Sequence, residues 1–153
     1  MRVAVLLLAL ALSAGACSNT TEVVVEDTAS AKHVRLGERF TLRLGETALV
    51  AEDGTTIRFE SVANDSRCPA DVDCIREGEA YAHFTIQEEG VAPQPLRLEI
   101  AGFVTEVQDI ERYQFQTAGR YVVALLLLQP YPGLAREAEM APTATLEIRH
   151  LTR

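Results

Sequence analysis

The chain has 153 residues, of which 48% are hydrophobic and 24% are charged. This composition is typical of one globular domain and not of a disordered segment. Fourteen Lys and Arg residues are outnumbered by 22 Asp and Glu residues, which gives a formal net charge of −8. Binding to nucleic acid and electrostatic attachment to anionic lipid both need a basic surface, so this acidity argues against both.

The N-terminal segment has the features of a secretory signal peptide. Arg2 gives a positively charged start, residues 3–12 form an uninterrupted apolar run, and small residues follow up to Cys17. A transmembrane helix needs about 20 apolar residues, and this run is shorter. We therefore predict that residues 1–16 direct export of the chain.

The sequence Ala14-Gly15-Ala16-Cys17 resembles the lipobox of bacterial lipoproteins, with Ala14 at a position where that family usually has Leu. The resemblance implies that residues 1–16 are removed and that Cys17 carries lipid, whose several acyl chains anchor the protein in a membrane. Ser18 stands where an Asp would resemble an inner-membrane retention signal. The expected location is therefore the cell envelope, at the outer membrane facing the periplasm. Ordinary secretion, with Cys17 left as an odd thiol, is the alternative.

A polar segment follows the predicted lipidation site. Residues 17–34 are rich in Thr, Ser, Ala and Glu, and we expect them to form a flexible tether. Residues 23–25, three consecutive valines, could instead form a first edge strand.

The rest of the chain shows the periodicity of β-strands. Apolar and polar residues alternate in five segments, whose apolar positions are Phe40, Leu42 and Leu44; Ile57 and Phe59; Ala80, Ala82, Phe84 and Ile86; Leu96, Leu98 and Ile100; and Ala144, Leu146 and Ile148. This pattern predicts half-buried antiparallel strands. Residues 121–128 are apolar throughout, which favours a central strand covered on both faces over a buried helix, since the segment begins with β-branched residues and ends at Pro130.

Turn signals separate these segments. Asp53-Gly54 lies between Val50 and Ile57 and predicts a hairpin. Only residues 134–140 have a helical pattern. We therefore expect one all-β domain over residues 35–153, an antiparallel β-sandwich, Ig-like or small and barrel-like, with about six to eight strands.

Residues 64–80 do not have the pattern of a strand or of a simple turn, and they contain Cys68 and Cys74. An exported protein enters an oxidising compartment, so these two cysteines are predicted to form a disulfide. A redox pair usually has two intervening residues, and a two-thiolate metal site would need a further Cys or a nearby His. Both alternatives fit the spacing less well.

The residues DSRCP at 65–69, Cys74 and GEA at 78–80 resemble a group of small uncharacterised bacterial lipoproteins that have this loop between two strands. In that group an aromatic residue often follows the second cysteine by two positions, where this chain has Arg76. Residues 125–132 are similar to the group's hydrophobic strand ending in Pro-Tyr-Pro. The resemblance implies a β fold and no defined activity.

The cysteine loop is also the candidate binding loop, through its charged side chains Asp65, Arg67, Asp71, Asp73, Arg76 and Glu77. Oxygen-rich loops can hold Ca²⁺, and Asp65, Asp71 and Asp73 are weak candidates for such a site. Their spacing does not match an EF-hand. Pairing of the acids with the two arginines, or exposure to water, explains them more simply.

No motif for hydrolysis, phosphate binding or metal-dependent catalysis occurs in the sequence, and no cofactor is expected. We therefore expect a lipid-anchored, non-catalytic binding or structural module whose partner is an envelope protein or a glycan and not nucleic acid. Two alternatives stay open. One is a small envelope enzyme that uses the carboxylates of the loop, and the other is a Ca²⁺-stabilised module of the adhesion type.

Overall fold

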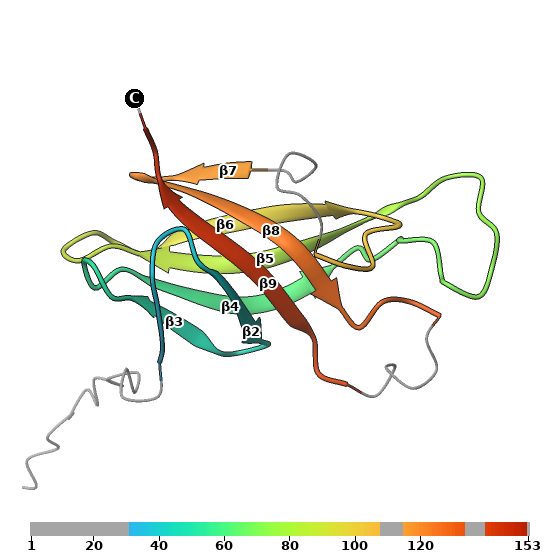
Figure 1. The fold of residues 1–153 in the computed structure, drawn as a ribbon, viewed down its shortest axis with the longest axis horizontal. Coiled ribbons are helices and arrows are strands. Elements are labelled where there is room, and N and C mark those ends of the chain that lie inside the picture. Colours follow the sequence, from blue (N-terminus) through green and yellow to red (C-terminus); the bar gives the residue numbers. More distant parts are fainter. Residues whose placement is uncertain (1–30, 108–114, 134–139, 153) are drawn as a thin grey trace, which may run out of the picture.

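The computed structural model describes residues 31–107, 115–133 and 140–152, which form a sandwich of two β-sheets (Figure 1). The five-stranded sheet has the order β1-β3-β4-β5-β6, and the four-stranded sheet has the order β2-β9-β8-β7. The strands are β1 (Lys32–Val34), β2 (Arg39–Arg43), β3 (Thr47–Val50), β4 (Thr56–Ala63), β5 (Glu79–Gln87), β6 (Gln94–Ala101), β7 (Phe115–Ala118), β8 (Tyr121–Gln129) and β9 (Thr143–His150).

This architecture confirms the predicted all-β sandwich. Among the described residues there are nine strands and not six to eight, because β1, β3 and β7 add short strands that alternation over three or four residues does not reveal. β1 pairs in parallel with β3, whereas the other described pairs are antiparallel. β1 also occupies the end of the segment expected as a tether, so sheet structure begins three residues before the expected boundary.

Several predicted features fall on residues that the structure does not describe. These are the signal peptide, the lipidation site Cys17, the valines 23–25 and most of the helical pattern at 134–140. Within the described ranges, no helix has the length and apolarity needed to cross a bilayer.

The core lies between the two sheets and is built by the predicted alternation. In β5 the apolar positions are buried and the polar ones point outward, as expected for a strand with one face on the core. The Phe59 and Phe84 rings, which are direct partners in the register of β4 and β5, stack at 5.0 Å. Leu44 differs from the prediction and is exposed, because β2 ends at Arg43 and the chain turns away through Gly45.

β8 is covered on both faces, as its apolar sequence predicts. Its inward residues join the main core, while Ala124 and Leu126 point to the outer side and are covered by Val104 and Val107 from the segment after β6. The predicted hairpin between β3 and β4 is also present, and Gly54 has the positive φ of 74° that the turn requires.

Candidate functional site

The disulfide loop, residues 64–78, joins β4 to β5 and projects beyond the end of the sheets (Figure 1, green). Cys68 and Cys74 form a disulfide with a Cα–Cα distance of 5.9 Å, which confirms the predicted bond. The bond closes a small ring within the loop and links no strands of the sandwich. The conformation of this ring is therefore restricted independently of the core.

Arg67 attaches the loop to the sandwich. Its guanidinium donates to both carboxylate oxygens of Asp65, with Nε–Oδ1 2.9 Å and Nη2–Oδ2 2.7 Å. The same group donates to the carbonyl oxygens of Leu128 at 2.7 Å and Pro130 at 3.0 Å, which lie at the end of β8 and just beyond it. Arg67 is only 3% exposed, and burial of a charge is tolerated when it is paired and hydrogen-bonded in this way.

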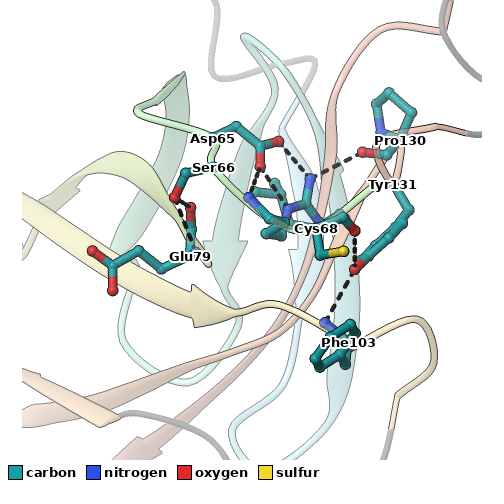
Figure 2. A network of polar contacts seen from close by, with 9 residues as sticks. Asp65, Ser66, Cys68, Glu79, Phe103, Pro130 and Tyr131 are labelled. Carbon is teal, nitrogen blue, oxygen red and sulfur yellow. Dashed lines mark hydrogen bonds and ion pairs between the residues drawn. The ribbon is translucent and has the colours of Figure 1, made fainter. Parts of the chain in front are cut away.

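Tyr131 joins three loops at the same end of the sandwich (Figure 2). Its hydroxyl donates to the carbonyl oxygen of Cys68 at 2.8 Å and accepts from the backbone N–H of Phe103 at 3.1 Å. The Arg67 guanidinium lies over its ring, 5.1 Å from the centroid. The disulfide loop therefore packs against the segments that follow β6 and β8.

The base of the loop is closed by backbone contacts. The N–H of Ser66 donates to the Glu79 carbonyl oxygen at 2.8 Å, and the N–H of Cys68 donates to the Glu77 carbonyl oxygen at 2.8 Å. Gly78 allows this close approach: its φ is +69°, and a Cβ placed there would lie 1.9 Å from the Ser66 carbonyl oxygen. Only glycine combines this backbone angle with this lack of space.

The tip of the disulfide loop, residues 70–77, exposes aliphatic side chains. Ile75 is fully exposed and Val72 is 53% exposed. Charged residues surround them in sequence and are exposed as well, namely Asp71, Asp73, Arg76 and Glu77. The tip therefore has two exposed aliphatic side chains among charged residues that are acidic on balance.

The six charged residues predicted to form a binding surface divide into two groups. Asp65 and Arg67 pair at the root of the loop, so Arg67 is a buried anchor and not an exposed binding residue. The other four are exposed at the tip. Across the described residues, no three His, Cys, Asp or Glu side chains come together as a metal site, and the two oxygens of Asp65 already accept bonds from Arg67.

Tyr131, Val72 and Ile75 were missed as site residues by sequence reasoning. Tyr131 lies in a Pro-Tyr-Pro-Gly sequence that reads simply as a turn, and nothing local indicates that its hydroxyl reaches Cys68. Ile75 did carry a signal, since an aliphatic residue directly after a cysteine in an otherwise polar loop has no core to enter.

A second polar cluster closes the opposite end of the sandwich, around the hydroxyl of Tyr121. This hydroxyl donates to Asp53, lies 2.9 Å from the Thr55 hydroxyl and accepts from Arg120 Nε at 3.1 Å. Arg120 also pairs with Asp53 at 3.3 Å and with Glu88 at 2.9 Å. The cluster thus ties together the β3–β4 turn, the end of β5 and the β7–β8 turn.

The electrostatics of this cluster favour a charged Asp53 and a neutral Tyr121. Burial alone would raise the pKa of Asp53, but hydrogen bonds from Tyr121 and Thr55 and the charge of Arg120 outweigh it, so this pKa lies below its ordinary value of 3.8. Burial, followed by the hydrogen bond to Asp53, raises the pKa of Tyr121 above 10.0. Because its contacts join three turns, the cluster acts as a structural clasp.

The chain matches no known protein-family model, and it shows no significant similarity to a curated protein or to a solved structure.

Proposed function

We propose that this protein is a lipid-anchored component of the cell envelope, at the outer membrane facing the periplasm, and that its disulfide loop recognises an envelope protein without catalysis. The signal-peptide pattern and the lipobox-like sequence ending at Cys17 support the anchoring. The geometry of the loop supports the recognition.

The observation that carries the proposal is the exposure of Ile75 and Val72 at the tip of a restrained loop. Apolar side chains grouped on a surface mark sites of protein association, because their burial against a partner removes them from water. The aliphatic character of this surface favours a protein over a glycan, for which an aromatic platform and polar groups would be expected.

Restraint of the loop lowers the entropy cost of binding. The Cys68–Cys74 bond, the buried Arg67 and the Tyr131 hydrogen bonds hold the loop before any partner arrives. A surface that is ordered in advance loses less conformational freedom on association. Loops supported by a rigid sheet commonly have this role.

Anchoring is tested by replacing Cys17 with Ser in cells fed a palmitate analogue. We expect the wild-type chain to be labelled and to sediment with membranes, and we expect Cys17→Ser to lose both properties. An unlabelled wild-type chain would contradict the anchoring.

Recognition is tested with a photo-cross-linking amino acid in place of Val72, activated in intact cells. We expect a discrete cross-linked species that Ile75→Ser weakens by about tenfold or more, since burial of one Ile side chain contributes about 1.5 to 3 kcal/mol. The matched control is Val91→Ser, which removes an exposed aliphatic residue from the β5–β6 turn at the other end of the sandwich. A cross-link that persists unchanged in Ile75→Ser would refute recognition through the tip.

A further inference from the structure

Although the chain is acidic, the outer face of its four-stranded sheet is basic where β2 and β9 pair. The residues of β2 alternate between exposed and buried, so Arg39, Thr41 and Arg43 all point away from the core. Arg149 lies on the same outer face of β9, two residues after Glu147, which is the partner of Arg39 in the register. We call this surface, with Lys32, the basic face.

Lys32 reaches this face from the other sheet. It begins β1 at the edge of the five-stranded sheet, and its ammonium donates to the carbonyl oxygen of Thr41 on β2 at 3.1 Å. An ammonium has three donors, so this one bond positions the group and leaves it able to bind an anion. Lys32 and β2 therefore form one continuous cationic surface across the edges of both sheets.

A buried carboxylate positions two of the arginines. Glu147 has a side chain only 4% exposed and pairs with Arg149 and, at 3.8 Å, with Arg39. Both arginine side chains remain about half exposed. The four cations of the basic face are opposed by Glu147 and Glu46. The adjoining turn has Arg35 and Glu38, and Glu52 accepts a hydrogen bond from the Leu36 N–H in this turn. The face has a local positive excess in a chain of net charge −8.

A shallow depression of about 630 Å³ opens in this surface. Its lining comprises Lys32, Arg43, Glu46 and the three threonines Thr41, Thr47 and Thr143. The backbone N–H of Arg43 donates to Glu46 Oε2 at 2.8 Å, which holds this acid at the β2–β3 turn. An ammonium, a guanidinium and hydroxyl groups are the donors that bind a phosphate.

The chain enters the sandwich at this depression. Lys32 begins the first described strand, and residues 18–31 separate it from Cys17. Even fully extended, a segment of that length spans no more than about 50 Å. If Cys17 is lipidated, this segment keeps the domain close to the membrane, and the basic face contains the part of the described chain that is nearest to the anchor in sequence.

We propose that the basic face lies against anionic phospholipid headgroups, with a headgroup phosphate between Lys32 and Arg43. This inference rests on the lipid anchoring proposed above: the acyl chains supply the affinity, and the basic face sets the orientation of the domain. The overall acidity still opposes electrostatic attachment, which the acyl chains must supply, but it favours this orientation, because the acidic remainder of the surface is repelled from an anionic bilayer.

The chain offers a direct probe of this orientation, because Lys32 is its only lysine. The purified lipidated protein is incorporated into vesicles of phosphatidylcholine, with or without phosphatidylglycerol, and treated with a water-soluble amine-reactive reagent. Peptide mass spectrometry then measures the labelling rate of Lys32 itself. We expect phosphatidylglycerol to slow the labelling about fivefold or more at low ionic strength, and added salt to restore it.

The double variant Arg39→Gln, Arg43→Gln should abolish the slowing, whereas Arg97→Gln on the outer face of the five-stranded sheet should preserve it. Circular dichroism of each variant establishes that the sandwich is folded. Equal labelling rates in both kinds of vesicle would overturn the orientation while leaving the anchoring intact. A chain that does not associate with phosphatidylcholine vesicles at all would overturn both proposals.

Discussion

Replacement of Arg67 by Met removes the anchor of the disulfide loop while nearly preserving side-chain length. Two of the lost hydrogen bonds go to Asp65 and two to the carbonyl oxygens of Leu128 and Pro130. Arg67 is 3% exposed, so water does not reach its place readily, although the Asp65 side chain is 29% exposed and can be hydrated in part. Each buried group left without a partner costs about 1 to 3 kcal/mol, and removal of one member of a buried ion pair costs about 3 to 5 kcal/mol.

We therefore expect Arg67→Met to lower the free energy of unfolding by about 3 to 5 kcal/mol, measured by urea denaturation. This is a large part of the about 5 to 15 kcal/mol of a typical domain. Asp65→Asn keeps one acceptor oxygen but leaves the buried Arg67 charge without a counter-charge, so it should also destabilise, by about 3 kcal/mol.

The matched control is Arg97→Met, which removes an exposed guanidinium lying over Tyr81 at 4.7 Å. An exposed cation over an aromatic ring contributes about 0.5 to 1 kcal/mol. If Arg67→Met cost no more than this control, the buried network would not be what holds the loop to the sandwich, and the account of the root of the loop would be wrong.

Three other substitutions or conditions test the remaining contacts. Gly78→Ala should destabilise by at least about 1 kcal/mol more than Gly37→Ala in thermal unfolding, because both have positive φ but only Gly78 would place its Cβ 1.9 Å from a carbonyl oxygen; equal effects would exclude the steric explanation. The double variant Cys68→Ser, Cys74→Ser should lose about 2 to 2.5 kcal/mol on the chain-entropy estimate, and an unchanged urea midpoint would contradict it. The folded-state pKa of Asp53 lies below 3.8, so its contribution to stability should be present above about pH 4 and be lost as pH falls through that lower pKa; Asp53→Asn should flatten this part of the pH–stability profile, and an unaltered profile would count against the clasp.

The sequence predicts the β-sandwich well because its signal is local. The alternation of polar and apolar residues in β5 predicts which face of the strand packs on the core. The apolar positions of β5 are indeed buried in the structure. β1 is different because it has only three residues. It pairs in parallel with β3 because the chain crosses to the other sheet as β2 before it comes back as β3. Period-two reasoning cannot detect a strand of this length, nor can it give its direction.

The disulfide loop shows the same limit for the candidate site. Cys68 and Cys74 were predictable as a pair from their spacing and from the export that residues 1–16 predict, since both patterns lie in the sequence. The role of Arg67 was not predictable, because the carbonyl groups that accept its hydrogen bonds belong to Leu128 and Pro130, which are 61 and 63 residues away in the sequence. A charged residue in a polar loop is indistinguishable in sequence from a solvated one until the fold brings buried carbonyl groups to it.

The disulfide bond lies wholly within one loop, and this has a practical consequence for producing the protein. Material made in a reducing compartment should still assemble both sheets, since no strand depends on the sulfur bridge. Such a preparation would have the circular dichroism spectrum of the folded sandwich, while residues 68–74 would no longer be closed into a ring. Under the proposed role of the loop, weak partner binding by a recombinant sample would then reflect the oxidation state of two sulfur atoms and not the choice of assay.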